Sequence, residues 1–337
     1  MKRPIVALAV STASMLVLAA CGGNSSASAP ASSSSNSAKN VTITIGTFPD
    51  PRPMGIVKEE GWLEKQGYTV KWETFLNGIP GEIAAAAGGS LDMGQADTSG
   101  MMPLFVKDPT LAWYVGTETG DVVQIIARKG SGITSVAGLK GKVITTPGLN
   151  TADQVVLDLA LHKAGLPLNA GTYPIATGPN SVIAMQNGTV DAASAYVPFS
   201  AQMIVNGTGR LIATADQVYG KPWVAGGLFV TRAFAKAHPQ AVRDVLKAVL
   251  RAENLIKTQP ATAYKLLSQY SGASVAAIKY SYDHNFIRLL PLVPDKQAMI
   301  AEAKTEQQYG VFSGNPTTFI NSWVNTSFAA AVAGGKP

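Results

Sequence analysis

The sequence predicts an α/β protein of two similar lobes, one inserted in the other through two crossovers. Two stretches carry this prediction, Phe75–Met102 and Ser181–Pro198. In each, a helix ends at a glycine, and a short strand follows that ends in polar or aromatic residues. Open α/β sheets bind ligands at the carboxyl ends of their strands, so the two stretches are interpreted as half-sites that face each other. About 300 residues follow residue 40, more than a single core normally serves.

Residues 1–20 have the features of a secretory signal peptide. Lys2 and Arg3 form a positive start, and the apolar run that follows is too short to span a bilayer. A small-residue motif then precedes Cys21, the single cysteine, so no intrachain disulfide can form. The segment resembles a bacterial lipoprotein signal, which implies cleavage before Cys21 and lipid on its sulfur. We therefore expect an extracytoplasmic protein, lipid-anchored to the cell membrane, at the cell surface or in the periplasm.

The residues after the cysteine predict a flexible tether. Residues 21–40 are mostly serine, alanine and asparagine, which offer almost nothing to bury. Without Lys2 and Arg3 the chain keeps 25 basic residues against 21 acidic ones, a net charge of +4. No basic block is present, so we expect no nucleic-acid partner.

Alternating and periodic apolar residues predict the elements of the first lobe. Strands are expected at 41–46, 70–75, 91–96, 111–116 and 122–127, with helices at 54–62 and 83–87. The glycine-rich segment 128–132 is expected to be the first crossover. The first lobe is therefore expected to comprise residues 41–130 and, after a return, 221–337.

The second lobe is expected at 131–220. It begins with a strand at 143–146 and a helix at 152–164, continues into the second half-site, and adds a strand at 211–214. Gly226 and Gly227 mark the return to the first lobe. Apolar residues at helical spacing then predict a scaffolding helix between Pro239 and Pro260.

Several stretches together resemble the substrate-binding proteins of ABC importers for sulfonates, taurine and nitrate, a family that includes binding proteins for thiamine-pyrimidine precursors. The stretches are GTFPDPRP with VKEEGWLEKQGYTVKW, TFLNGIPGEIAAAAGGSLDMGQADTS, LKGKVITTPGLNTADQVVLDLALHKAG, NGTVDAASAYVPFSAQ, AFAKAHPQAV and YGVFSGNP. The resemblance implies a type II periplasmic-binding-protein-like fold, whose lobes close like a hinge on a small ligand. It also implies docking on a membrane permease and, through it, an ATPase. We expect a monomer without cofactor or metal.

The resemblance and the strand ends together indicate candidate ligand-binding residues. Helix N-termini at Asp97–Ser99 and Asn150–Thr151 would favour an anion, although the same residue types also cap helices. In the first loop, Arg52 could clamp a sulfonate and Asp50 could hold an amine. The complete candidate set is Phe48, Asp50, Arg52, Asn77, Gly78, Asp97, Thr98, Ser99, Thr146, Asn150, Thr151, Tyr196, Phe199 and Trp223.

Two departures from the family pattern leave the ligand open. Ala96-Asp97-Thr98-Ser99 stands where members often have Gly-Asp-Thr-Pro, and no acid follows Tyr196. The missing acid indicates a ligand without a cation at that end, or a larger and more apolar one. An aromatic vitamin precursor stacked among Tyr196, Phe199 and Trp223 is one alternative, and a ligand-sensing lobe for a membrane receptor is another.

The sequence gives little support for an enzymatic function. It contains no G-x-S-x-G elbow, no H-E-x-x-H motif and no P-loop. The three histidines, His162, His238 and His284, lie far apart without metal-ligand spacing. We therefore expect a binding protein rather than an enzyme.

Overall fold

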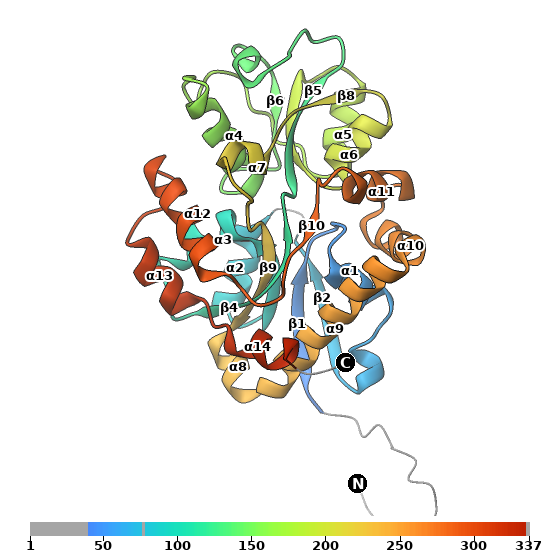
Figure 1. Ribbon diagram of the computed structural model, residues 1–337, viewed down its shortest axis with the longest axis vertical. Helices are drawn as coiled ribbons and strands as arrows, with labels where there is room; N and C mark the ends of the chain where they lie inside the picture. Colours follow the sequence, from blue (N-terminus) through green and yellow to red (C-terminus); the bar gives the residue numbers. More distant parts are fainter. Residues whose placement is uncertain (1–39, 76–77, 335–337) are drawn as a thin grey trace, which may run out of the picture. The chain divides into compact units, whose positions relative to one another are not determined.

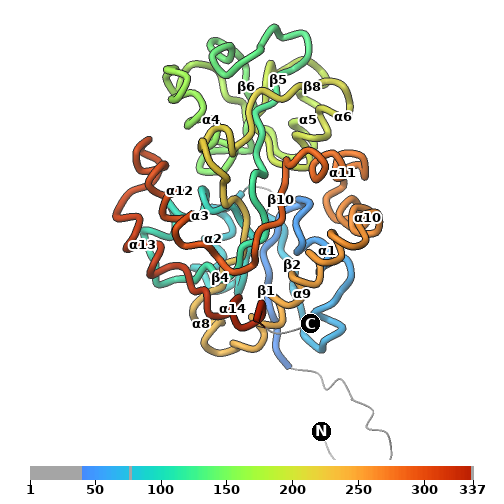
Figure 2. The backbone as a smooth tube through the Cα atoms, in the orientation of Figure 1, coloured from blue at the N-terminus to red at the C-terminus, as the bar shows by residue number. Residues whose placement is uncertain are grey.

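The computed structural model describes residues 40–75 and 78–334 (Figures 1 and 2). The expected signal peptide, Cys21 and nearly all of the tether lie outside the described residues, as does the candidate Asn77. Within the described ranges, no helix combines the length and the apolar character that crossing a membrane requires.

A six-stranded mixed sheet forms the larger of two layered assemblies, in the order β10-β4-β9-β3-β1-β2. Its strands are β1 (Thr42–Thr47), β2 (Thr69–Thr74), β3 (Met93–Asp97), β4 (Ala112–Gly120), β9 (Gly226–Thr231) and β10 (Arg288–Leu289). The strands β1, β2 and β3 run parallel, whereas β9 is antiparallel to both β3 and β4. Their carboxyl ends place the loops after β1 and β3 at one edge.

Helices cover both faces of this sheet (Figure 1). Period-two alternation explains the two faces, because Leu228 and Val230 of β9 join one core and Phe229 joins the other. The first face packs on α1 (Pro53–Glu59), α8 (Arg232–Ala237), α9 (Pro239–Thr258), α10 (Pro260–Ser271) and α14 (Ser327–Ala333). The second packs on α2 (Ile79–Ala87), α3 (Thr98–Phe105), α12 (Lys296–Gln308) and α13 (Pro316–Trp323). Helix α9 confirms the scaffolding helix predicted from its apolar spacing.

A four-stranded sheet in the order β6-β7-β5-β8 forms the second assembly. Its strands are β5 (Val123–Arg128), β6 (Ile144–Thr145), β7 (Ala192–Tyr196) and β8 (Gly209–Thr214). Its helices are α4 (Ala152–Lys163), α5 (Pro179–Gln186), α6 (Phe199–Val205) and α7 (Ala215–Tyr219). Alternation again separates the faces: Ile125 of β5 packs with α4 and α7, and Ile126 packs with α5 and α6. The structure also has two short 3-10 helices, η1 (Glu64–Gln66) and η2 (Val136–Leu139).

The positions at which the chain passes between the sheets differ from the expected ones. The strand β5, expected in the first lobe, pairs with β7 and β8, so the first passage lies near Asp121 rather than at 128–132. Both strands around that passage are buried, and the apolar pattern of β5 does not tell which sheet it joins. The return near Gly226 agrees with the start of β9.

A third segment also reaches the four-stranded sheet. Ala277, in α11 (Val275–Asp283), and the following Phe286 and Ile287 pack into the core of that sheet, although 221–337 was expected wholly in the first lobe. The Gln124 amide donates to the Phe286 carbonyl at 3.1 Å. The course of this segment can be followed in Figure 2. The inserted assembly is therefore held by three segments of chain rather than two.

Charged side chains tie these passages together. Asp121 has a left-handed backbone conformation (φ 52°), and its carboxylate accepts from the Asp216 amide at 3.1 Å. Asp216 in turn accepts from the Trp223 amide at 2.8 Å, on the return passage. The Arg288 guanidinium of β10 is paired with the Asp216 carboxylate. One ion-pair network thus connects all three segments.

Matched aspartates directly precede the strand of each half-site. The Asp92 carboxylate accepts from the Thr44 amide at 2.8 Å, and the Asp191 carboxylate accepts from the Val143 amide at 3.1 Å. Each aspartate lies at a helix-to-strand joint and anchors the neighbouring strand through its backbone. Both aspartates therefore have a structural role.

Candidate functional site

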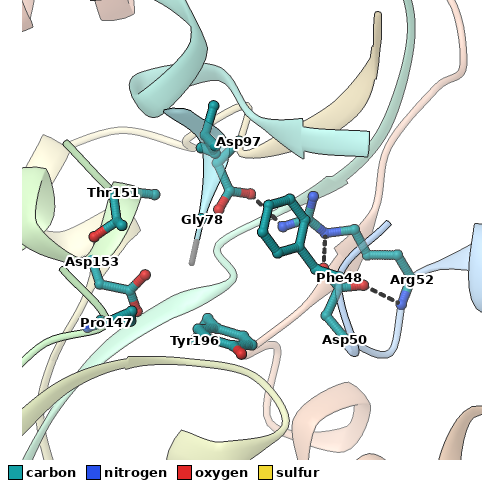
Figure 3. A pocket seen from close by; sticks show the side chains of 11 residues that line it. Phe48, Asp50, Arg52, Gly78, Asp97, Pro147, Thr151, Asp153 and Tyr196 are labelled. Atoms are coloured by element: carbon teal, nitrogen blue, oxygen red, sulfur yellow. Dashed lines mark hydrogen bonds and ion pairs between the residues drawn. The ribbon is translucent and has the colours of Figure 1, made fainter. Parts of the chain in front are cut away.

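A cavity of about 40 Å³ lies between residues of the two assemblies (Figure 3). A buried water needs about 10–15 Å³ on this scale, so the cavity has room for roughly three waters. From the six-stranded side it is lined by Phe48, Asp50, Arg52, Gly78, Ile79 and Asp97. From the four-stranded side it is lined by Pro147, Thr151, Ala152, Asp153 and Tyr196.

The loop after β1 brings Phe48, Asp50 and Arg52 to one wall. Two tyrosines hold its backbone: the Tyr270 hydroxyl donates to the Phe48 carbonyl at 2.6 Å, and the Tyr282 hydroxyl donates to the Pro51 carbonyl at 2.7 Å. Both tyrosines come from helices that lie more than 200 residues further along the chain. The conformation of this loop therefore depends on long-range contacts.

Among the described residues that line the cavity, Arg52 is the single cationic side chain, and it is 2% exposed. Its Nε lies 3.0 Å from Asp50 Oδ2 as an ion pair, without the direction of a hydrogen bond. Its Nη2 donates to Asp97 Oδ1. A Cβ on Gly226 would lie 2.5 Å from Arg52 Nη1, so the guanidinium also packs against bare backbone. The guanidinium therefore already pairs with two carboxylates, and its role as a bidentate clamp on a sulfonate stays a prediction.

Burial raises the pKa of the acids around Arg52. The pKa of Asp50 rises from 3.8 to about 7 because burial outweighs the opposing effect of the Arg52 charge. Burial also raises the pKa of Asp97, again against Arg52. Behind them, Glu118 accepts from the Met54 amide at 3.1 Å and from the Gln95 side chain at 2.7 Å, and burial raises its pKa as well. One guanidinium thus balances several buried carboxyl groups.

Glu82 of α2 adds a fully buried carboxyl group against the backbone of the sheet. Its Oε1 accepts from the Gln95 amide at 3.0 Å, while its Oε2 has no hydrogen-bond partner among the described residues. A Cβ on Gly46 or Gly94 would lie 2.3 or 2.4 Å from Oε1, so both strands need glycine at these positions. Burial raises the pKa of Glu82 well above its ordinary value.

The opposite wall is built on the N-terminus of α4 and the end of β7. Thr151 caps α4 by accepting from the Gln154 amide at 3.3 Å, as its residue type predicts. Gly78, which precedes α2 with φ 86°, lies against the Thr151 methyl: a Cβ there would be 3.2 Å away. Asp153 follows in the first turn of α4 and is 3% exposed. The two assemblies therefore contact each other at one side of the cavity.

Seven predicted residues come together around the cavity: Phe48, Asp50, Arg52, Gly78, Asp97, Thr151 and Tyr196. Asp97 faces the cavity and Arg52, and it makes no side-chain bond to its own helix although it is the N-cap of α3. The Asp97 carboxylate therefore points into the cavity and not back onto α3.

Other candidates point elsewhere. Thr98 is fully buried and donates to Glu302 at 2.6 Å, and Trp223 donates to the same carboxylate at 2.9 Å and stacks on Tyr219. Ser99 and Asn150 line a second cavity of about 330 Å³ between α3, α4 and the end of α12. Thr146 contacts Gln154, and Phe199 is buried behind Tyr196 in an edge-on ring contact. The three rings expected to stack on an aromatic ligand thus do not surround one space.

Sequence reasoning missed Ile79, Pro147, Ala152 and Asp153. Asp153 matters most, because it is the third carboxylate of the cavity and was not among the predicted residues. The available signal was its place two residues after the predicted helix cap Thr151, where an acid also serves the helix dipole. The described part of the chain holds no group of three or more His, Cys, Asp or Glu side chains that could bind a metal ion.

The model of the NMT1-like family matches residues 36–269, more than half of the chain. The chain belongs to the NMT1-like family. A relative from Bacillus subtilis (strain 168), named as an aliphatic sulfonates-binding protein, is 29% identical over 261 residues, which cover 75% of this chain and 73% of the relative. This NMT1-like chain is thus similar over most of its length to a protein named for ligand binding.

Solved structures share the fold of this NMT1-like protein. The alkanesulfonate-binding protein SsuA from Xanthomonas axonopodis pv. citri, bound to MOPS, matches with a TM-score of 0.72 and 22% identity, over 86% of this chain and 99% of that one. The periplasmic nitrate-binding protein NrtA from Synechocystis PCC 6803 matches with a TM-score of 0.70 and 15% identity, over 87% and 89%. The fold is therefore that of type II periplasmic binding proteins, as predicted.

Proposed function

We propose that this protein is the substrate-binding component of an ABC importer and captures a small sulfonate, with nitrate as an alternative ligand. One observation carries the proposal: a small cavity is lined by residues from both sheets, and its polar side chains lie in the loop after β1 or at the ends of strands and helices. Family membership and the name of the Bacillus relative support it. The protein binds and delivers its ligand and catalyses no reaction on it.

The two sheets with their helices are proposed to be two lobes that open and close on the ligand. The cavity of about 40 Å³ is smaller than an organic sulfonate needs, so the lobes are proposed to separate to admit the ligand. The proposed ligand contacts are the seven lining residues predicted from the sequence, with Asp153 added.

Ligand identity can be tested by native mass spectrometry of the purified protein, followed by thermal-shift measurements with alkanesulfonates, aminosulfonates and nitrate. A ligand that binds only the folded state raises the melting temperature in a concentration-dependent way. If no member of the panel raises the melting temperature, the sulfonate or nitrate assignment is wrong.

We also propose that the folded part is anchored through lipid on Cys21 and delivers its ligand to a membrane permease. Metabolic labelling with a fatty acid should mark the protein and place it in the membrane fraction, and Cys21→Ser should lose both properties. A Cys21→Ser variant that stays membrane-bound would contradict the anchor. A role as a receptor's sensing lobe would instead appear as co-purification with a sensor kinase and not with a permease.

A further inference from the structure

Two stacked rings of the four-stranded assembly contact two carboxyl groups of the six-stranded one. Tyr219, the last residue of α7, and Trp223, on the return passage, stack with ring centroids 5.5 Å apart. The Tyr219 hydroxyl donates to Glu306 Oε1 at 2.8 Å, and Trp223 Nε1 donates to Glu302 Oε1 at 2.9 Å. Glu302 and Glu306 lie one turn apart in α12 and therefore share one face of that helix. Each ring thus donates to one acid.

The bond between Tyr219 and Glu306 joins a helix of one assembly to a helix of the other. Helix α7 and both rings pack into the core of the four-stranded sheet, whereas α12 packs on the six-stranded sheet. Both helices can be located in Figure 1. Beside this bond, Lys221 Nζ donates to the Thr305 hydroxyl of α12 at 3.2 Å. Separation of the two assemblies would therefore break the bond to Glu306.

The two acids are buried, and neither forms an ion pair within the described part of the chain. Glu302 is 2% exposed and Glu306 is 0% exposed, and the Oε2 atom of each has no hydrogen-bond partner among the described residues. Two carboxylates on adjacent turns, away from water, repel each other, so this arrangement favours a proton on the pair. Burial, and next the Glu302 charge, hold the pKa of Glu306 well above its ordinary value. Burial also raises the pKa of Glu302 to about 8.

The surrounding charges do not cancel this repulsion. The Lys221 charge lowers the pKa of both acids, but burial outweighs it in each case and also lowers the pKa of Lys221 itself. The Asp97 charge, from the six-stranded side, raises the pKa of Glu302 further. The titratable groups that interact with the pair, taken over the helices, strand and passage around it, are Asp97, Tyr114, Lys163, Tyr219 and Lys221.

We propose that the Tyr219–Glu306 bond is a proton-dependent clasp, so that the protein takes up a proton when its two lobes close. The inference rests on the proposed function insofar as the lobes open and close. In the closed state Glu306 is buried and protonated, and its carbonyl oxygen still accepts from Tyr219. In the open state Glu306 loses Tyr219, meets water and releases the proton.

The clasp gives lobe closure a definite dependence on pH. The closed state binds more protons than the open state between the ordinary pKa of a glutamate, 4.5, and the raised pKa of Glu306 in the closed state. Within this window the closed state is therefore favoured at low pH and disfavoured as pH rises. Ligand retention should weaken in the same direction, because the ligand is held by the closed state.

Single-molecule fluorescence energy transfer without ligand tests the clasp. The full chain with Cys21→Ser has no cysteine, so Lys129→Cys, after β5, and Lys247→Cys, in α9, place one dye on each assembly at exposed positions. We expect the ratio of open to closed molecules to rise about 10-fold or more from pH 6 to pH 8, where one proton allows about 100-fold. Two populations whose ratio stays constant or falls over this range would overturn the clasp.

A matched pair of variants locates the effect. Glu306→Gln keeps an acceptor for Tyr219 and removes the titration, so the rise should shrink to about threefold or less, with acids of the cavity such as Asp50 supplying the remainder. The control is Glu253→Gln in α9. Glu253 is also buried, with a pKa that burial raises to about 8, but it pairs with Lys257 on its own helix. The control should keep the full rise, and an equal rise in folded Glu306→Gln protein would overturn the inference.

Tyr219→Phe tests the clasp without changing any acid. The variant keeps the ring that stacks on Trp223 and loses the hydroxyl that donates to Glu306. We expect the ratio of open to closed molecules to increase about threefold or more at each pH, the effect of one lost hydrogen bond. An unchanged ratio would overturn the clasp.

These outcomes can be distinguished from a failure of the proposed function. The measurement contains no ligand, so a thermal-shift panel without any binder would overturn the sulfonate or nitrate assignment and leave the clasp standing. A single population at every pH would overturn the clasp together with the proposed opening of the lobes.

Discussion

Asp97 is the N-cap of helix α3, yet its carboxylate accepts from the Arg52 guanidinium instead of from its own helix. The pair connects the end of β3 with the loop after β1 and places both charges at the cavity. Because Asp50 pairs with the same guanidinium, Arg52 is both a structural centre and a part of the binding wall.

Replacing Arg52 with Met should destabilise the protein strongly. The change leaves Asp50 and Asp97 buried without their shared counter-charge, and breaking a buried ion pair in this way costs about 3–5 kcal/mol. Urea denaturation at pH 7.5 measures the loss. Arg243→Met is the control, because Arg243 contacts only Gln240 on its own helix in the described hydrogen bonds and should change stability by about 0.5 kcal/mol or less. Equal effects of the two changes would show that Arg52 has no special structural role.

Gly226→Ala should disturb the packing around the Arg52 guanidinium. The added methyl would lie 2.5 Å from Arg52 Nη1 and 2.8 Å from Thr119 Oγ1, distances that force one of them to move. We expect a loss of about 1–3 kcal/mol, as for other overpacked sites. In Gly81→Ala the new methyl in α2 would meet only Phe75, at 3.5 Å, so the better helix propensity of alanine should raise stability by up to about 1 kcal/mol. Thermal denaturation of both variants is the measurement, and a stable Gly226→Ala protein would contradict the packing described.

Stability of the ligand-free protein should fall as pH rises from about 4 to about 7. The pKa of Asp50 is 3.8 when unperturbed and about 7 in the fold, so within this window the folded state binds more protons than the unfolded state. The contribution is therefore complete below pH 4 and is lost as pH approaches 7. One pKa unit corresponds to about 1.4 kcal/mol, which gives an upper limit of about 4 kcal/mol for this group.

Melting temperatures across this range, for the wild type and Asp50→Asn, check the sign. The variant should show a shallower fall, although the other buried acids retain part of it. Asp108→Asn is the control, since hydrogen bonds from Thr110 lower the pKa of the exposed Asp108 and its removal should not reduce the fall. A wild-type protein that becomes more stable between pH 4 and 7 would contradict this assignment.

Thr98→Val should affect folding rather than ligand binding. The Thr98 hydroxyl is buried and donates to Glu302, so its loss leaves that carboxyl group short of a partner. We expect a destabilisation of about 1–3 kcal/mol with ligand affinity nearly unchanged. Calorimetry of unfolding and of binding separates the two effects. A large loss of ligand affinity in a stable variant would show that Thr98 contributes to the ligand site.

Local patterns predicted the elements well because each rule acts over a few residues. Alternation marked β1, apolar spacing marked α9, and glycines marked helix ends. The strand-end rule also brought Asp50 and Asp97 to one place, because parallel neighbouring strands end at the same edge.

Such local rules could not predict the direction in which a side chain points or the sheet that a strand joins. Thr98 and Asp97 are adjacent, yet one turns inward to Glu302 and the other outward to Arg52, because partners 204 and 45 residues away decide their rotamers. The strand β5 would suit either buried sheet by its composition. Asp153 was overlooked because an acid in a first helical turn has an ordinary explanation, and its place in the wall of the cavity becomes visible only in three dimensions.

The matched aspartates show that the two walls of the cavity repeat one local arrangement. Asp92 anchors a strand amide 48 residues earlier in the chain, and Asp191 does the same at the same separation. Each is followed at once by a five-residue strand, which ends at Asp97 in one half and Tyr196 in the other. Acid and phenol thus occupy equivalent backbone positions in a repeated module. Asp97 pairs with Arg52 while Tyr196 presents a ring, so the two copies of the module contribute different side chains to one cavity.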